Sequence, residues 1–233
     1  MGANLGPNIV TNGLVLTLDA GNRNSYAGSG TNWYDLSGNG NNGTLTNGPT
    51  FSSTNLGSIV FDGVDDYVNL TSDLILDTTK PFTITSFFKL NSYNNTFPTL
   101  FTIKTSTGDS LILLITEYSS YAPLTFGWNG TNTYKPSTTL SLNQWYNISL
   151  IYNGNGITSS SNFSLYINNI SQTLSNSYVF GGIGQVNTLA TLNTGSSSFY
   201  FNGNIPSFQI YNRALAASEI LQNYNATKSR FGL

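Results

Sequence analysis

The sequence predicts an all-β protein, a sandwich of two antiparallel sheets with one short C-terminal helix. Short runs of alternating apolar and polar side chains recur along the chain, and turn-forming residues separate them. Asn-Gly pairs occur eight times, and such pairs favour the left-handed backbone conformations that close β-hairpins. A length of 233 residues fits one large β domain.

The composition excludes several classes of function. Charged residues make up 8% of the chain and the net charge is -2, so no basic surface is available for nucleic acid. The chain has no Cys and no His, which removes thiol and imidazole nucleophiles and the usual zinc and copper sites. No apolar stretch approaches the ~20 residues that a membrane span needs. We therefore expect neither a nucleic-acid nor a membrane partner.

The N-terminal part of the chain alternates between irregular and extended segments. Residues 1–12 are rich in Gly, Asn and Pro and predict an extended arm that orders against a neighbouring protein. Residues 13–19 predict a strand, because every second residue is Leu. Residues 20–50 predict a long ordered loop with a short strand near residues 43–45. Its large side chains, expected to anchor it, are Tyr26, Trp33 and Tyr34.

The central feature of the sequence is a hairpin over residues 58–70 that reverses at residues 62–66. Gly63 is expected where the backbone needs a positive φ or passes close to another group. Three of the ten acidic residues lie in this turn, which makes it a candidate corner for holding a cation. The alternative is that these carboxylates only accept hydrogen bonds from turn amides and water.

The C-terminal two thirds of the chain predict a series of strands and then a helix. Strands are expected at residues 81–90, 98–104, 110–116, 124–128, 144–153, 161–168, 198–201 and 205–211. Pro206 cannot donate a ladder hydrogen bond, so we expect it at a strand start or at a sheet edge. Residues 216–225 have apolar side chains at helical spacing and predict a helix of two to three turns.

The ordered set of motifs resembles the laminin-G-like domains of the concanavalin A-like lectin/glucanase superfamily. The residues that carry the resemblance are 13–20, 33–45, the motif Phe61-Asp-Gly-Val-Asp-Asp-Tyr67, Trp145, 165–168, 201–203, 210–215 and 219–220. The resemblance implies a concanavalin A-like jelly-roll β-sandwich. We predict one such domain over residues 13–226, preceded by the arm and followed by a C-terminal tail at residues 227–233.

The resemblance also implies a calcium site. It brings the loop of residues 35–42 beside the acidic turn, and calcium binds through carboxylate, amide and carbonyl oxygens. The candidate ligands for one structural calcium ion are Asp35, Asn39, Asp62 and Asp66. The alternative is hydrogen bonding within the loops.

Carbohydrate chemistry divides into hydrolysis and binding. Glycosidases need two opposed carboxyl groups, and the glucanases of the superfamily would require a Glu-x-Asp-x-x-Glu motif. This chain lacks that motif, and its only two Glu residues, Glu117 and Glu219, are far apart in sequence, so we predict that it is not an enzyme. Binding needs aromatic platforms beside polar side chains. The candidate carbohydrate-binding residues are Tyr93, Tyr118, Tyr121, Trp128, Asn129 and Tyr134.

The alternative for each of these aromatic residues is that it covers the sheet or packs against a neighbouring subunit. One form of the laminin-G-like domain, with Asp-Ala-Gly-Asn at residues 19–22 and Asn-Tyr-Asn-Ala-Thr-Lys at residues 223–228, is similar to stand-alone proteins encoded by tailed bacteriophages. This resemblance predicts a non-enzymatic decoration or adhesion protein on the virion surface, outside the cell after host lysis. Its expected partners are other virion proteins, host surface glycans and further copies of itself. The alternatives are a free bacterial carbohydrate-binding lectin module and a glycoside hydrolase.

Overall fold

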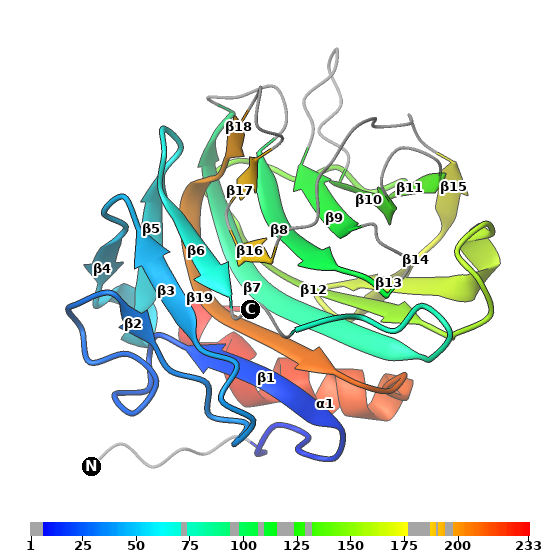
Figure 1. Ribbon diagram of the computed structural model, residues 1–233, viewed down its shortest axis with the longest axis horizontal. Helices are drawn as coiled ribbons and strands as arrows, with labels where there is room; N and C mark the ends of the chain where they lie inside the picture. The colour runs from blue at the N-terminus through cyan, green and yellow to red at the C-terminus, as the bar shows by residue number, and fades with distance from the viewer. Residues whose placement is uncertain are drawn as a thin grey trace.

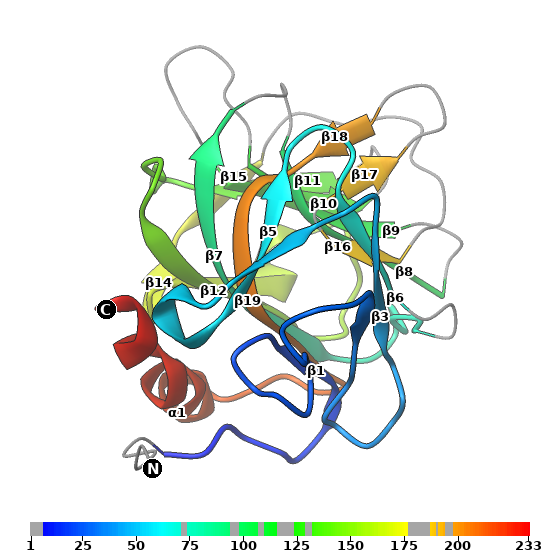
Figure 2. The same ribbon diagram turned by 90° about the vertical axis from the view of Figure 1, so that its left-hand side faces the viewer.

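The predicted β-sandwich is confirmed: two antiparallel sheets pack face to face, and one short helix lies on the outer side of one of them (Figures 1 and 2). The helix, α1, spans Ala217–Thr227. The computed structural model describes residues 7–70, 74–93, 98–106, 110–115, 124–128, 132–176, 187–189, 191–193 and 198–233. Every strand pair within these residues is antiparallel.

The first sheet, sheet A, has the longest strands at its centre. Its strands, in spatial order, are β14 (Ile170–Gln172), β13 (Phe163–Ile167), β12 (Trp145–Tyr152), β7 (Phe82–Ser92), β19 (Asn202–Tyr211), β5 (Ser58–Asp62) and β4 (Thr50–Ser52). A further strand, β1 (Leu14–Asp19), pairs with the second half of β19.

The second sheet, sheet B, is made of shorter strands. In spatial order they are β15 (Leu174–Asn176), β11 (Asn132–Pro136), β10 (Leu124–Trp128), β9 (Ser110–Ile115), β8 (Thr99–Lys104), β16 (Thr188–Leu189), β6 (Tyr67–Leu70), β3 (Gly43–Thr46) and β2 (Asn32–Trp33). A separate hairpin joins β17 (Thr191–Asn193) to β18 (Ser198–Tyr200).

Short 3-10 helices occur at η1 (Thr54–Leu56), η2 (Ser160–Asn162) and η3 (Lys228–Phe231). None of the helices in the described ranges combines the length and the hydropathy that crossing a membrane requires.

The core lies between the two sheets and is rich in aromatic rings. Alternate residues of the strands point into it, so that Leu16 and Leu18 of β1 are fully buried. Aromatic pairs join the layers: Phe101 of β8 meets Phe208 of β19 edge to face, with ring centroids 5.6 Å apart. Phe126 of β10 meets a β13 ring in the same way at 5.5 Å. These contacts fix the two sheets against each other.

Pro206 lies inside the central strand β19, so the prediction that it marks a strand start or an edge is wrong. On one side of β19 the first residues pair with β5, up to Ile205, and the later residues pair with β1, from Ser207 onward. On the other side, the register with β7 shifts between Asn204 and Ser207. Pro206 therefore sits where both ladders are interrupted, and its missing N–H breaks no regular pairing.

The N-terminal segment packs on its own chain. The Val10 amide donates to Asn223 Oδ1 of α1 at 2.8 Å, and the Tyr211 hydroxyl donates to the Val10 carbonyl at 3.0 Å. The Val10 side chain is buried beside Leu215 and Ile220. Residues 7–12 are thus fastened to their own domain through Val10, and the ordering of the arm against a neighbouring protein stays a prediction. Residues 1–6 lie outside the described part.

The C-terminal segment also packs closely against sheet A. Phe231 is buried, with its ring centroid 4.9 Å from that of Phe87 and 4.5 Å from that of Trp145. Arg230 forms an ion pair with Asp19 at 2.9 Å. Residues 227–233, predicted as a tail, thus complete the cover that α1 forms over the outer side of sheet A (Figure 2).

Candidate functional site

The acidic turn between β5 and β6 adopts the tight conformation that its sequence predicts. Gly63 has a φ of 77°, and a Cβ at this position would lie 2.7 Å from the Asn202 Cβ, so glycine is required for both predicted reasons. Asp62 Oδ1 accepts the Val64 amide at 2.7 Å, which holds the turn from inside. Asn202 Nδ2 donates to the Asp62 carbonyl at 2.7 Å and fixes the turn to β19.

Three carboxylates meet in this turn. Asp62, Asp65 and Asp66 each offer an oxygen within 4.8 Å of the other two. Asp66 is 4% exposed, and burial raises the pKa of its carboxyl, as do the negative charges of Asp62 and Asp65. A hydrogen bond from the Asp62 amide to Asp66 Oδ2, at 3.0 Å, acts in the opposite direction. The turn therefore concentrates negative charge that a bound cation would neutralise.

The donor atoms of the acidic turn suit calcium, which prefers carboxylate oxygens. Asp62 and Asp65 are exposed and lie beside the buried Asp66. Asp66 accepts the Asp62 amide through Oδ2, which directs its carboxylate into the turn. The oxygen donors of the turn fit a hard cation.

The predicted calcium ligands Asp35 and Asn39 do not belong to this cluster. Asp35 Oδ1 accepts the Thr17 amide at 2.9 Å and the Ser37 amide at 2.8 Å, and its Oδ2 accepts the Asn41 amide at 3.0 Å. The Asn39 side chain donates to Ser37 Oγ at 2.9 Å. These side chains hydrogen-bond within their own loop and to the adjacent strand β1, in line with the alternative of loop hydrogen bonding considered for them.

The strand pairing shows why the two sets cannot share an ion. Thr17, which Asp35 contacts, pairs with Gln209, whereas Asp62 pairs with Asn202 on the same strand β19. Seven residues of β strand span about 23 Å. The prediction of one site containing Asp35, Asn39, Asp62 and Asp66 is therefore wrong, and only the two residues from the hairpin remain candidates.

The predicted carbohydrate-binding set is also divided. Tyr134 is 2% exposed, its ring lies 5.8 Å from that of Phe126 and 5.3 Å from that of Phe163, and its hydroxyl donates to the Ile157 carbonyl at 3.0 Å. The prediction that Tyr134 binds sugar at a loop rim is wrong, because β11 turns this ring into the core. Burial raises the pKa of its phenol accordingly.

The other members are less directly placed. Tyr93 follows β7, packs partly buried against the core, and its hydroxyl donates to the Leu140 carbonyl at 3.5 Å. Trp128 ends β10, where the structure describes its backbone only. Tyr118, Tyr121 and Asn129 lie outside the described residues. The loop rim therefore stays a prediction.

An exposed tyrosine was missed by the sequence reasoning. Tyr26 and Trp33 are buried and anchor the loop over residues 20–50 as predicted, but Tyr34 is 48% exposed. The exposure of Tyr34 could have been predicted, because side chains alternate between the two faces of an extended segment. Trp33 points into the core, so its neighbours Asn32 and Tyr34 point the other way. The side-chain Nδ2 of Asn32 donates to the Tyr34 hydroxyl at 3.2 Å.

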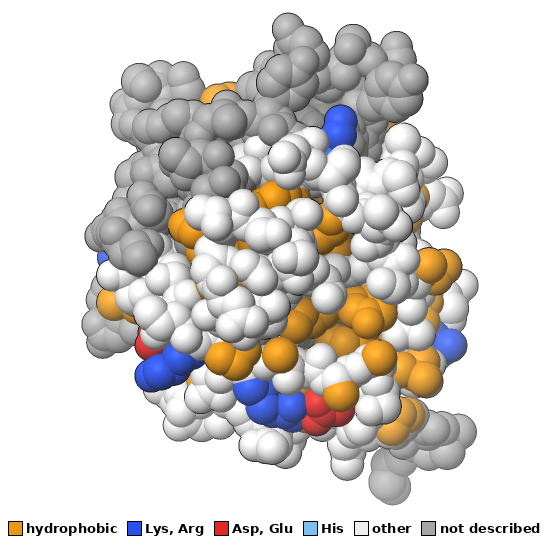
Figure 3. All heavy atoms as spheres, turned by 90° about the vertical axis from the view of Figure 1, so that its right-hand side faces the viewer, with side chains coloured by type: hydrophobic (Ala, Val, Ile, Leu, Met, Phe, Trp, Pro, Cys, Tyr) orange, Lys and Arg blue, Asp and Glu red, His pale blue; other side chains and the backbone are white. Residues whose placement is uncertain are grey.

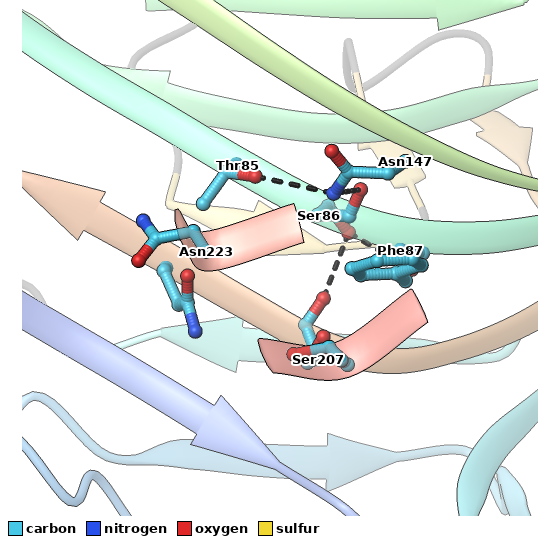
Figure 4. A pocket seen from close by; sticks show the side chains of 8 residues that line it. Thr85, Ser86, Phe87, Asn147, Ser207 and Asn223 are labelled. Atoms are coloured by element: carbon cyan, nitrogen blue, oxygen red, sulfur yellow. Dashed lines mark hydrogen bonds between the residues drawn. The ribbon is translucent and has the colours of Figure 1, made fainter. Parts of the chain in front are cut away.

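One small polar cavity lies between sheet A and α1 (Figure 4). Asn147 Nδ2 donates to Thr85 Oγ1 at 3.3 Å, and the Ser86 hydroxyl donates to the Ser207 carbonyl at 2.9 Å. Asn223 of α1 closes the space, which is about 10 Å³ and fits one water molecule. The cavity is too small for a sugar or a cofactor, so it is part of the packing of the helix.

The family of the chain follows from its sequence. A laminin G family model, described as the concanavalin A-like lectin/glucanases superfamily, matches residues 62–221. The chain belongs to this family. The matched region begins at the acidic turn and ends within α1, so it contains most of both sheets. No curated protein matches the chain.

Solved structures share the fold at low sequence identity. Domain 4 of the extracellular GH43 arabinanase AbnA from Geobacillus stearothermophilus, solved with arabinotriose, has a TM-score of 0.64 at 17% identity, covering 91% of this chain and 98% of that one. Trypanosoma rangeli sialidase in complex with sialic acid has a TM-score of 0.66 at 14% identity. There the match covers 99% of this chain but 35% of the sialidase chain.

The botulinum neurotoxin type G receptor binding domain gives a TM-score of 0.59 at 16% identity, with 91% of this chain and 51% of that one covered. These likenesses show a concanavalin A-like, lectin-like sandwich. The match covers nearly all of the arabinanase domain but only a part of the longer sialidase chain.

Proposed function

We propose that this chain is a non-catalytic carbohydrate-binding protein. The observation that carries the proposal is the likeness to arabinanase domain 4, which was solved with arabinotriose and which this chain covers almost completely. The likeness to the sialidase covers only about a third of that longer chain. The proposal therefore rests on the sugar-bound arabinanase domain, and the activity of the whole sialidase does not enter it.

The surface chemistry supports recognition of polar, uncharged ligands. Charged side chains are few in the whole sequence and occupy a small part of the face shown in Figure 3. Asn, Ser, Thr and Tyr supply hydroxyl and amide groups that donate to and accept from sugar hydroxyls. A surface of this kind suits glycans better than phosphate-rich partners.

The absence of catalysis is supported by the state of Glu219. Its carboxylate accepts two hydrogen bonds from the Arg213 guanidinium, at 2.6 and 2.8 Å, and a third from the Ala216 amide at 2.9 Å. The Arg213 hydrogen bonds lower the pKa of Glu219 to about 2. A general acid needs the opposite shift, so Glu219 acts as a structural residue at the start of α1.

For its biological setting, we propose a decoration or adhesion protein on the surface of a phage virion, bound to other virion proteins and to host surface glycans. The support is the sequence resemblance to the stand-alone bacteriophage form. Quantitative mass spectrometry of purified particles tests it: the chain should copurify at fixed stoichiometry with capsid or tail proteins. Its absence from particles would leave a free bacterial lectin module as the better assignment.

We also propose that the acidic turn binds one structural calcium ion through Asp62, Asp65 and Asp66. The support is the approach of their oxygens and the buried position of Asp66. Calcium should raise the melting temperature in a saturable manner, because a ligand of the folded state stabilises it. An identical melting curve in calcium and in EDTA would refute the site.

The experiment for carbohydrate binding is a glycan array together with affinity electrophoresis on soluble polysaccharides. We expect at least one bacterial or plant glycan to be bound, and we expect no release of reducing sugar from the bound glycan over a long incubation. Time-dependent hydrolysis would favour the glycoside hydrolase alternative. Binding to no glycan, with the protein folded, would refute the proposed function.

A further inference from the structure

The outward side chains of β2, β3 and β6 form an exposed surface at one end of sheet B, which we call the edge face. Trp33, Leu45 and Val68 point from these strands into the core and are buried. The alternate residues therefore point outward. The edge face consists of Asn32, Thr44, Thr46, Tyr67 and Asn69, together with Tyr34, which directly follows β2.

The edge face is open and uncharged. None of the three strands contains a charged residue. Asn32, Thr44 and Asn69 are exposed, and Tyr34 is 48% exposed, the only aromatic residue among the large exposed hydrophobic side chains of the described ranges. Amides, hydroxyls and the half-exposed Tyr34 ring are groups that can recognise sugar hydroxyls and the apolar faces of sugar rings.

Tyr34 is held in place before any ligand binds. Its amide donates to the Ser25 carbonyl at 2.7 Å, and the hydroxyl of the fully buried Ser25 donates to the Tyr34 carbonyl at 2.6 Å. Its own hydroxyl accepts a hydrogen bond from the side-chain Nδ2 of Asn32. A ring fixed at both ends loses little conformational entropy on binding, which favours affinity.

The pairing register aligns the polar groups across the strands. Asn32 pairs with Thr44, and Thr44 pairs with Asn69, so these side chains form one row perpendicular to the strands. Neighbouring strands lie about 4.8 Å apart, a spacing close to the repeat of an extended chain of pyranose rings. Successive sugars of such a chain would meet successive side chains of the row.

A second aromatic residue lies diagonally opposite. Tyr34 directly follows Trp33, whose partner on β3 is Gly43, whereas Tyr67 pairs with Thr46 at the other end of β3. The two rings are therefore separated by about 13 Å along the strand and about 10 Å across it, the length of a short oligosaccharide.

The acidic turn adjoins the Tyr67 end of the face. Asp66 directly precedes Tyr67, and Asn47, which follows Thr46, donates to the Asp65 carbonyl at 2.9 Å. When no cation is bound, the three carboxylates at this end repel anionic ligands such as sialic or uronic acids. In that state the charge of the site favours a neutral ligand.

We propose that the edge face is the glycan-binding site of this protein and that it takes a neutral, extended polysaccharide laid across β2, β3 and β6. Tyr34 stacks on one sugar ring, and Asn32, Thr44 and Asn69 bond to hydroxyls of its neighbours. This assignment rests on the proposed carbohydrate-binding function and names its surface and its class of ligand.

The test compares four proteins on a fixed panel of probes by affinity electrophoresis. The neutral probes are linear arabinan, mannan and mixed-linkage β-glucan, and the anionic probes are polygalacturonate and polysialic acid. The proteins are the wild type, Tyr34→Ala, Thr44→Lys and, as a control on the opposite sheet, Ile170→Ala, which alters a residue that is 67% exposed. All four are expected to melt within a few degrees of one another, because each change is at an exposed position.

In EDTA, with no cation in the acidic turn, we expect binding to at least one neutral probe and to neither anionic probe. Tyr34→Ala should weaken that binding about tenfold, because a ring that is half-buried by the ligand is lost. Thr44→Lys should weaken it at least as much by blocking the centre of the row, while Ile170→Ala should bind as the wild type does. Neutral binding that both edge-face variants retain, or a preference for an anionic probe, would overturn the edge face while leaving carbohydrate binding intact. Binding to no probe would count against the proposed function itself.

Discussion

The two sheets have polar outer faces of similar composition but opposite accessibility. On sheet A, the outward residues Thr85, Asn147 and Ser207 are buried beneath α1 and the terminal segments. On sheet B, the outward residues Asn32 and Thr44 of the edge face are exposed. Polar outward positions on a strand therefore do not by themselves mark a binding surface. What decides is whether the chain covers them itself.

The covered face is held mainly by aromatic rings and by the two termini. Phe231 stacks on Phe87 and packs on Trp145, and Arg230 pairs with Asp19. The N-terminal segment joins the same assembly through Val10. If this account is correct, loosening the cover lowers stability without changing what the edge face binds.

The largest effect is expected from Phe231→Ala. The side chain is buried, so its removal should lower the free energy of unfolding by about 3 kcal/mol, through lost contacts and the cavity left behind. Urea unfolding measures this. Leu233→Ala, at a residue that is 36% exposed, is the control and should change stability by less than about 0.5 kcal/mol. Equal stability of the two variants would show that the C-terminal segment does not hold the cover.

A smaller effect is expected from Tyr211→Phe. The Tyr211 hydroxyl donates to the Val10 carbonyl and accepts from Asn223 Nδ2, each at 3.0 Å, and burial raises the pKa of the phenol to about 12. Removing the hydroxyl leaves two buried groups unpaired and should cost about 1 to 2 kcal/mol. Hydrogen exchange should show faster exchange at the Val10 amide, whereas exchange in β3 should not change. Unchanged exchange at Val10 would argue against a joint cover of the two termini.

The Arg213–Glu219 pair predicts a pH dependence of the covered side. Arg213 lowers the pKa of Glu219 from its ordinary value of 4.5 to about 2, so the folded state binds the proton less tightly than the unfolded state. The stabilisation is therefore complete above pH 5 and is lost as the pH falls toward 2. Because both side chains are about a quarter exposed, we expect only about 1 kcal/mol.

Chemical unfolding of wild type and Glu219→Gln between pH 2 and pH 6 measures this contribution. The difference in the free energy of unfolding between the two proteins should shrink as the pH falls from 5 to 2. A difference that stays constant over this interval would contradict the assigned role of the ion pair.

The smallest change in stability is expected at the acidic turn, beside the edge face. Burial and the charges of Asp62 and Asp65 raise the pKa of Asp66, so its ionised form costs stability at neutral pH, and that cost disappears as the pH falls through the raised pKa. Asp66→Asn keeps an oxygen for the Asp62 amide and should gain about 0.5 kcal/mol at pH 7 without calcium.

The same variant should lose the stabilisation by calcium that we propose for the wild type. Thermal melts of both proteins, with calcium and with EDTA, provide the comparison. An equal calcium response in Asp66→Asn and wild type would remove Asp66 from the proposed ligands.

The spacing of apolar residues predicted the fold, because each strand or helix buries one face and this fixes where its apolar side chains occur. The alternation of Leu14, Leu16 and Leu18 gave a strand of sheet A, and the helical spacing near Ile220 gave α1. Pro206 was misplaced because a single sequence does not show where a strand changes partners. The packing of Val10 on α1 was missed for a similar reason: it depends on residues more than two hundred positions apart.

The candidate sites were harder to predict, because they depend on how loops are placed and covered. Asp35 and Asp62 are chemically equivalent, and only the strand register separates them. Tyr134 and Tyr34 both lie in polar segments, yet one ring is in the core and the other at the surface. Side chains alternate between the two faces of a strand, so once Trp33 is known to be buried, its neighbour Tyr34 is predicted to point to the surface.

The most direct test of the central claim is an NMR titration of the labelled protein with a neutral oligosaccharide taken from the best-bound polysaccharide. Amide shift changes should concentrate at the edge face, at residues 32–34, 43–46 and 67–70, and residues under α1 should stay unchanged. Shift changes confined to the loop rim around Tyr93, Tyr118 and Trp128, with none in β3, would contradict it.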